Sequence, residues 1–214
     1  MRNNLSQLIS LSKIEEKLYR PADAYELSRV TRMEHVKTTI VETPQEGIAA
    51  VAARIAQLIN RREANGQKTV LSLASGRSMR DLFVELVRLH KEEGLSFKNV
   101  VVFGSYEFYP LSDTTSGSMA QIQSQLLEHV DILPENVHTF PGDLPKEDVF
   151  AFCEEYEKAI VEAGGIDVQV LGIGQCGNIA MNEPGTQPNS STRLVIMDGN
   201  SRVDVKSLFG NVAQ

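Results

Sequence analysis

Residues 69–78 read Thr-Val-Leu-Ser-Leu-Ala-Ser-Gly-Arg-Ser, and this stretch decides the fold that we expect. Its first five residues are mostly apolar, with a β-branched pair, as in a strand that is covered on both sides. Apolar side chains then recur at helical spacing: Met79, Leu82, Phe83, Leu86 and Leu89. The stretch therefore predicts a buried strand, a short loop and a helix.

The same alternation extends toward both ends of the chain. Thr43-Pro44-Gln45-Glu46 combines a capping hydroxyl, a proline at the first helical position and a glutamate three residues on, which predicts the start of a helix. Asn65-Gly66 predicts its end. Short apolar segments predict two more strands, and helical patterns lie between the strands: strands at 100–103 and 166–173, helices at 122–129 and 149–163.

Alternating strands and helices predict an α/β fold, namely a doubly wound, Rossmann-like, mostly parallel sheet with helices on both faces. We expect residues 38–214 to form this one domain, because 214 residues with 42% hydrophobic content suffice for one ordinary core. Residues 1–37 are expected to form an N-terminal helical arm, with a short helix over residues 5–19.

The charge and amino-acid composition of the chain argue against some kinds of binding partner. A formal net charge of -7 disfavours nucleic acid as a partner, because such binding needs a basic face. No apolar stretch approaches the length of a membrane span. Cys153 and Cys176 fit neither a disulfide framework nor a zinc site, so we expect a cytoplasmic protein with no metal.

The loop Ser75-Gly76-Arg77-Ser78 joins a strand to a helix, where backbone N–H groups and the helix dipole favour an anion. The positive charge of Arg77 favours phosphate further. An equally weighted interpretation is a turn in which Ser75 or Ser78 only caps the helix. The loop lacks the spacing of ATP-binding and dinucleotide-binding motifs, so we expect no cofactor.

The most specific stretch is Gly-Ile-Gly-Gln-Cys-Gly-Asn-Ile-Ala-Met-Asn-Glu-Pro, residues 172–184. It resembles the GxDGHIAFNEP motif of glucosamine-6-phosphate deaminases. The loop at Ser75–Ser78 stands where that family has its TGGT phosphate loop, and residues 102–108 resemble its FNxDEY motif. The resemblance runs from about Thr38 to Arg202 and implies a sugar-phosphate isomerase-like domain.

The resemblance also implies site residues. Ser75, Gly76, Arg77, Ser78, Gly174 and Gly177 would bind substrate or phosphate, with Arg193 and Arg202 as further anion-binding positions. The family's enolising aspartate falls on Tyr106, and its ring-opening aspartate and histidine fall on Cys176 and Asn178. A neutral phenol is a poor base and an amide cannot shuttle a proton. Glu183 keeps the family's residue, and Glu107 is the second candidate acid or base.

Three hypotheses follow. The first is a divergent deaminase or isomerase with altered catalysis. The second is a non-catalytic sugar-phosphate sensor or accessory domain, and the third, ranked lower, is a 6-phosphogluconolactonase-like hydrolase. The family's domain continues beyond the position of Gln214, so we expect a C-terminally truncated domain whose sheet edge is covered by a homo-oligomer or a fused C-terminal domain.

Overall fold

The computed structural model describes residues 23–25, 38–111, 113–174 and 176–209. Residues Met1–Val41 and Glu42–Gln214 form two separate compact units, and the second contains the sheet. The predicted helix over residues 5–19 lies outside the described residues. None of the helices in the described ranges has the length and apolar composition needed to cross a membrane.

Helix α2, Pro44–Ala64, begins and ends where the sequence predicts. The Thr43 hydroxyl accepts a hydrogen bond from the amide of Glu46 at 3.3 Å, and the Glu46 carboxylate in turn accepts one from the amide of Glu42 at 3.2 Å. This reciprocal capping satisfies amides that the first turn of a helix leaves without partners. Asn65 is the C-cap and Gly66 follows with φ of 66°, which ends the helix.

The sheet has four parallel strands in the order β3-β2-β1-β4. Their bounds are Thr69–Leu73 for β1, Val100–Gly104 for β2, Val137–His138 for β3 and Val168–Val170 for β4. The fold prediction is confirmed. The prediction of a strand over residues 166–173 is wrong in its length. Val170 pairs with Leu73, the last residue of β1, and beyond it β1 has become a loop, so residues 171–173 have no strand to extend along.

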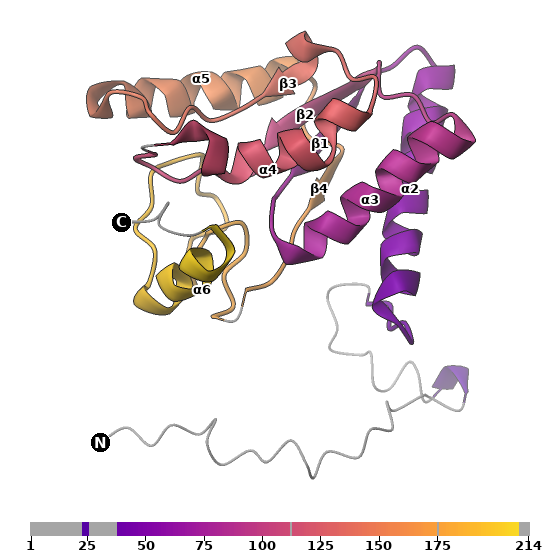
Figure 1. Cartoon of the computed structure of the whole chain (residues 1–214), viewed down its shortest axis with the longest axis horizontal. Helices are drawn as coiled ribbons and strands as arrows, with labels where there is room; N and C mark the ends of the chain where they lie inside the picture. Colours follow the sequence, from indigo (N-terminus) through magenta and orange to yellow (C-terminus); the bar gives the residue numbers. More distant parts are fainter. Residues whose placement is uncertain (1–22, 26–37, 112, 175, 210–214) are drawn as a thin grey trace. The chain divides into compact units, whose positions relative to one another are not determined.

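Helices cover both faces of the sheet (Figure 1). On one face Leu71, Leu73, Val100 and Val102 pack in a cluster with α2, with α3 (Arg77–Glu93) and with α4 (Ser118–Gln125). On the other face Val70, Val101 and Phe103 pack against Tyr156 of α5, Val149–Glu162. Alternate residues of each strand thus point to opposite faces, which is why the strands have nearly continuous apolar sequences.

The chain after β4 is mostly irregular and ends the described region with α6, Gly199–Phe209. Val205 and Phe209 of α6 are buried in the same cluster as α3, and the ring of Phe209 lies 4.9 Å from that of Phe108. This packing holds α6 beside the ends of β1 and β2. Four single-turn 3-10 helices complete the described elements: Thr114–Ser116, Leu127–His129, Pro134–Asn136 and Lys146–Asp148.

Candidate functional site

Two cavities lie at the carboxyl ends of the strands, where parallel α/β sheets bind ligands. The loop cavity, about 250 Å³, is lined by residues 74–79, by Gly174 and Asn178, and by residues of α6. The aromatic cavity, about 440 Å³, is lined by the face of α5, by Phe140 and by residues 190–195. Tyr106, Ala180 and Met181 line both cavities and form the wall between them.

The loop from Ser75 to Ser78 joins β1 to α3 through a conformation that glycine permits. Gly76 is the N-cap of α3 with φ of 115° and ψ of -179°, and no side chain caps the helix. Such backbone angles are essentially restricted to glycine. Neither serine is the cap that one interpretation of the sequence expected. The first-turn amides of Arg77 and Ser78 have no intrahelical acceptor, so they are available to an anion in the loop cavity.

Tyr106 is the residue on which the sequence resemblance places an enolising base, and its phenol is hydrogen-bonded to this loop. The Tyr106 hydroxyl lies 2.9 Å from the Ser75 hydroxyl and donates to the Ser75 carbonyl at 3.3 Å. The Ser75 hydroxyl also donates to the hydroxyl of Ser118, a fully buried residue, at 2.8 Å. Burial raises the pKa of Tyr106, so the phenol is protonated at neutral pH and is not a base.

Glu107 caps helix α4, whose first residue, Ser118, comes eleven positions later in the sequence. Its carboxylate accepts hydrogen bonds from the amides of Phe108 at 2.8 Å, Ser118 at 2.8 Å and Met119 at 2.9 Å. Gly117, the N-cap residue of α4, provides no side chain, and a Cβ there would lie 2.5 Å from the Glu107 carboxylate. Glu107 lines the aromatic cavity rather than the loop cavity. This geometry assigns it a structural task, and its catalytic role stays a prediction.

The glycine-rich stretch folds into two tight turns beside the loop cavity. The amide of Gly174 donates to the carbonyl of Asn178, and the amide of Gly177 donates to the carbonyl of Gly174, both at 2.9 Å. A Cβ on Gly174 would overlap the Asn178 side chain, so a larger residue there would displace that amide from its present position. Gly174 and Asn178 line the loop cavity, whereas Cys176 and Gly177 are not among its described lining residues.

Ala180 and Met181 form the second of these turns. Both are left-handed, with φ of 47° and 63°. The amides of Ile179 and Asn182 each donate to the other's carbonyl, at 3.0 and 2.8 Å, which closes a hairpin turn around the two residues. Turns with two left-handed central residues usually carry asparagine and glycine. The wall between the two cavities is therefore a strained backbone turn.

The remaining predicted residues lie outside the loop cavity. Glu183 accepts a hydrogen bond from the amide of Asp198 at 3.0 Å, and its other carboxylate oxygen is buried with no partner among the described residues. Arg193 lines the aromatic cavity and donates to the Ser191 carbonyl at 3.1 Å. Arg202 is exposed and donates to the Met197 carbonyl at 3.1 Å. These three side chains line no part of the loop cavity in the described residues.

Helix α6 contributes lining residues that the sequence did not single out, namely Ser201, Asp204 and Ser207. The Arg77 guanidinium donates to the Ser207 hydroxyl at 3.4 Å, which links the loop to α6. Ser201 is buried, and its hydroxyl has no partner among the described residues. The only sequence signal for this helix was the similarity near Arg202. The structure thus brings Ser75–Ser78, Tyr106, Gly174 and Asn178 together and adds α6.

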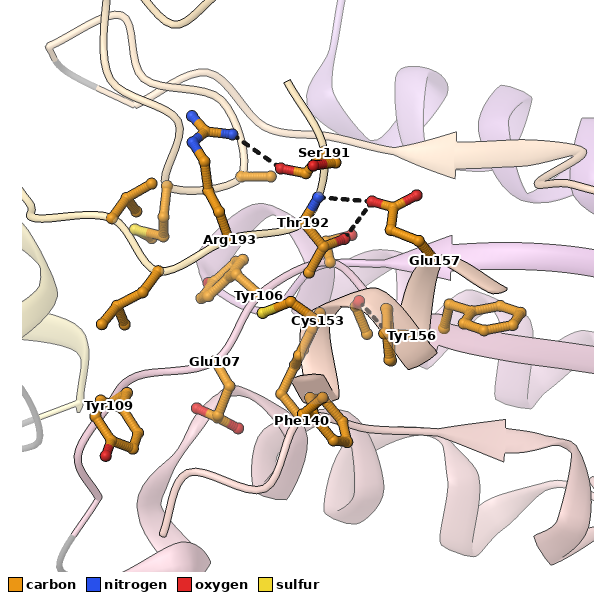
Figure 2. Close-up of a pocket in the computed structure, with 18 of the residues that line it drawn as sticks. Tyr106, Glu107, Tyr109, Phe140, Cys153, Tyr156, Glu157, Ser191, Thr192 and Arg193 are labelled. Atoms are coloured by element: carbon orange, nitrogen blue, oxygen red, sulfur yellow. Dashed lines mark hydrogen bonds between the residues drawn. The ribbon is translucent and has the colours of Figure 1, made fainter. Parts of the chain in front are cut away.

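The aromatic cavity is shown in Figure 2, with Cys153 and Tyr156 of α5 on one side and residues 191–193 on another. The Glu157 carboxylate accepts two hydrogen bonds from Thr192, one from its amide and one from its hydroxyl, both at 2.6 Å. These bonds hold the irregular segment against α5. No group of three His, Cys, Asp or Glu side chains suited to a metal ion occurs in the described parts of the chain.

The sequence profile of one protein family matches residues 42–204, and that family is described as glucosamine-6-phosphate isomerases/6-phosphogluconolactonase. A glucosamine-6-phosphate deaminase-like protein of Bacteroides thetaiotaomicron is 44% identical over 213 residues, which cover 99% of this chain and 32% of that protein. A glucosamine-6-phosphate deaminase of Porphyromonas gingivalis is 38% identical over 143 residues, 66% of this chain and 54% of that protein. The chain thus spans about a third to about half of these relatives.

Solved structures give the same picture. A monomeric glucosamine-6-phosphate deaminase superimposes with a TM-score of 0.75 at 30% identity, covering 84% of this chain and 73% of that chain. A 6-phosphogluconolactonase from Thermotoga maritima superimposes with a TM-score of 0.54 at 24% identity, over 66% of this chain and 61% of that chain. At this identity the second similarity concerns the fold alone.

Proposed function

The chain belongs to the family of glucosamine-6-phosphate isomerases and 6-phosphogluconolactonases, and we propose that it binds a hexose phosphate in the loop cavity with weakened deaminase turnover. The observation that carries this proposal is the loop itself. Residues 75–78 combine two first-turn amides, the Arg77 cation and small hydroxyl side chains around a cavity of about 250 Å³. Amides at a helix start together with a guanidinium suit the oxygens of a phosphate monoester.

Other lining residues of the cavity suit the sugar. Asp204 of α6 and the Asn178 amide line the same cavity as the phosphate loop. A carboxylate accepts hydrogen bonds from hydroxyl or ammonium groups, and an amide both donates and accepts. A phosphorylated sugar, or an amino sugar, satisfies both ends of such a site.

The chemistry of the remaining groups supports weakened turnover. Tyr106 is protonated and hydrogen-bonded to Ser75, where the reaction needs a base. Asn178 cannot carry a proton, and Cys176 is not among the described residues that line the cavity. Each general acid or base is worth typically 10²- to 10⁴-fold in rate, so these substitutions together remove most of the family's catalysis.

Binding is tested by titration calorimetry with glucosamine 6-phosphate, fructose 6-phosphate and unphosphorylated glucosamine. We expect heat from the two phosphates and none from glucosamine. Arg77→Ala should weaken binding about tenfold, the effect of losing one charge-assisted contact. Arg80→Ala is the matched control, because Arg80 is exposed on the same helix and does not line the cavity. Absence of heat from every phosphorylated hexose contradicts the proposal.

Turnover separates a weak enzyme from a sensor, the second candidate, which the loss of acid and base groups favours. Ammonia release from glucosamine 6-phosphate is measured for the wild type and for Glu183→Gln. If the protein is an enzyme, Glu183→Gln lowers turnover while sugar-phosphate binding stays near normal. If it is a sensor, neither protein releases ammonia above the uncatalysed rate and both bind.

We also propose a cytoplasmic location and self-association. Both cysteines are free, which agrees with a reducing compartment. The C-terminal strand β4 is an edge strand, and edges of sheets are usually covered. A molar mass for the free protein by light scattering tests the self-association, and a monomer at all concentrations contradicts it.

A further inference from the structure

Helix α5 presents one acidic side chain within an otherwise apolar face. Residues at steps of three and four line the aromatic cavity: Val149, Phe152, Cys153, Tyr156, Glu157 and Ile160. Residues at this spacing share one face of a helix. Burial raises the pKa of the Cys153 thiol, so this thiol is neutral and Glu157 is the charged group of the face.

Aromatic rings line the same cavity as this carboxylate. The ring of Phe140 stacks on that of Tyr156 with centroids 4.1 Å apart, and the ring of Phe152 lies 5.9 Å from that of Tyr156. The Tyr156 hydroxyl donates to the Gly104 carbonyl at 2.8 Å, which fixes the tyrosine at the end of β2. In Figure 2, Cys153 and Tyr156 of α5 lie between Phe140 and Glu157, whose carboxylate is turned toward Thr192. The rings are therefore a fixed surface rather than an adaptable one.

One oxygen of Glu157 has no partner. The carboxylate accepts both hydrogen bonds from Thr192 at its Oε1 atom. Its Oε2 atom has no hydrogen-bond or ion-pair partner among the described residues, and it is not among their fully buried atoms. A carboxylate with one occupied and one open oxygen beside a cavity is an acceptor for a donor group from a ligand.

The other charged groups of this cavity make hydrogen bonds to neutral groups. The two oxygens of Glu107 accept hydrogen bonds from three backbone amides. Arg193 is the one basic residue among the described lining residues, and its guanidinium donates to the Ser191 carbonyl and, at 3.2 Å, to the Asn182 side chain. The described lining of the aromatic cavity thus carries two carboxylates and one guanidinium, a formal excess of negative charge, whereas Arg77 and Asp204 balance each other in the lining of the loop cavity.

We infer that the aromatic cavity is a second binding site, for a small organic ammonium compound. The ammonium group would donate to Glu157 Oε2, and an aryl or alkyl body would lie against Phe140, Phe152 and Tyr156. A cation is attracted by the faces of aromatic rings as well as by a carboxylate, so the two features select the same ligand. The volume of about 440 Å³ falls in the range of small-molecule sites. This inference does not rest on the proposed function, because it uses a different cavity.

The decisive experiment compares two ligands of one shape on the full chain. Phenethylamine and 2-phenylethanol differ only in the ammonium and hydroxyl groups, and titration calorimetry at pH 7 measures both. We expect the amine to bind about tenfold more tightly, as one charge-assisted hydrogen bond implies. Equal affinities, or no heat from the amine at millimolar concentration, overturn the inference. This comparison needs no variant, so it holds even where a substitution impairs folding.

A matched pair of variants locates the site. In Glu157→Gln the side-chain amide oxygen still accepts from Thr192, so the variant removes the charge and keeps the contact. We expect it to abolish the preference for the amine over the alcohol. Glu154→Gln is the control, because Glu154 is exposed on the same helix and does not line the cavity. A preference that survives in Glu157→Gln, or that Arg77→Ala removes, places the amine elsewhere and overturns the inference.

Discussion

The two cavities lie on either side of one wall and are built in different ways. The loop cavity is made by regular elements, since β1 leads into Gly76 and α3. The aromatic cavity is made by the face of α5 and by an irregular segment that Glu157 holds through Thr192. Arg77 and Asp204 line the first cavity, and Glu107, Glu157 and Arg193 line the second. The comparison teaches that one α/β scaffold can border two cavities with different charged groups, one shaped by backbone and one by a side chain.

Among the substitutions that test this difference between the cavities, Tyr156→Ala should have the largest effect on stability. Tyr156 is 6% exposed and packs against Phe103, Phe140 and Phe152. Removing a buried aromatic ring costs about 3–5 kcal/mol of unfolding free energy. Urea unfolding measures this, and Tyr156→Phe, which loses the hydroxyl bonds to the Gly104 and His138 carbonyls but keeps the ring, should cost about 1 kcal/mol. A small loss in Tyr156→Ala would show that the aromatic cluster does not support the sheet.

Glu107→Ala tests the hydrogen bonds that hold the chain beside Tyr106, one of the residues between the two cavities. Three backbone amides near the start of α4 lose their acceptor, and we expect a loss of about 2 kcal/mol of unfolding free energy. Urea unfolding again measures it. Glu107→Gln keeps one oxygen acceptor and should lose less. A variant with wild-type stability and no turnover would instead assign Glu107 to catalysis.

Alkaline pH should lower the unfolding free energy through both Tyr106, in the wall between the cavities, and Tyr156, in the aromatic cavity. Burial raises the pKa of Tyr106 and of Tyr156 above the ordinary value of 10.0. Each tyrosine therefore adds stability that is fully present below pH 10 and is lost as the pH rises through the folded-state pKa. Within that window each contributes a slope of up to about 1.4 kcal/mol per pH unit. Unfolding of the wild type and of Tyr106→Phe between pH 9 and 12 checks this. Parallel curves contradict it.

Thr192→Val should have the smallest effect on stability, and it tests whether the two cavities are stabilised independently. The variant loses the hydroxyl bond to Glu157 and keeps the amide bond, so we expect a loss of about 1 kcal/mol. Hydrogen exchange should rise in residues 190–195, while residues 75–78 remain as in the wild type. Faster exchange in both regions would show that the two cavities share one unit of stability.

Sequence signals were sufficient wherever local chemistry decides structure. The cap at Thr43 and the helical repeat of α3 are local, and both appear as predicted. Strand β3, Val137–His138, has only two residues and so no periodicity to detect. Helix α6 begins at Gly199, where the Asp198 carboxylate accepts a hydrogen bond from the Asn200 amide at 2.8 Å, but its burial comes from distant partners such as Phe108.

The site was predictable in part for the same reason. Motifs in the sequence singled out the loop at residues 75–78 and Tyr106, and both line one cavity, while their roles in binding and catalysis stay predictions. The hydrogen bond from Tyr106 to Ser75 and the capping of α4 by Glu107 join residues that are 31 and 11 positions apart. Contacts of this kind depend on how the strand ends are arranged in space, which a pattern of residue types does not encode.

The turn at Ala180–Met181 has a consequence for any pair of ligands. Two consecutive left-handed residues without glycine hold a conformation that costs about 1–3 kcal/mol each, so the contacts around the turn must hold it in place. Both cavities border this turn. If a ligand on one side favours one form of the turn, thermodynamic linkage requires that the two ligands change each other's affinity by the same factor. The strained turn would then couple the two binding equilibria to each other.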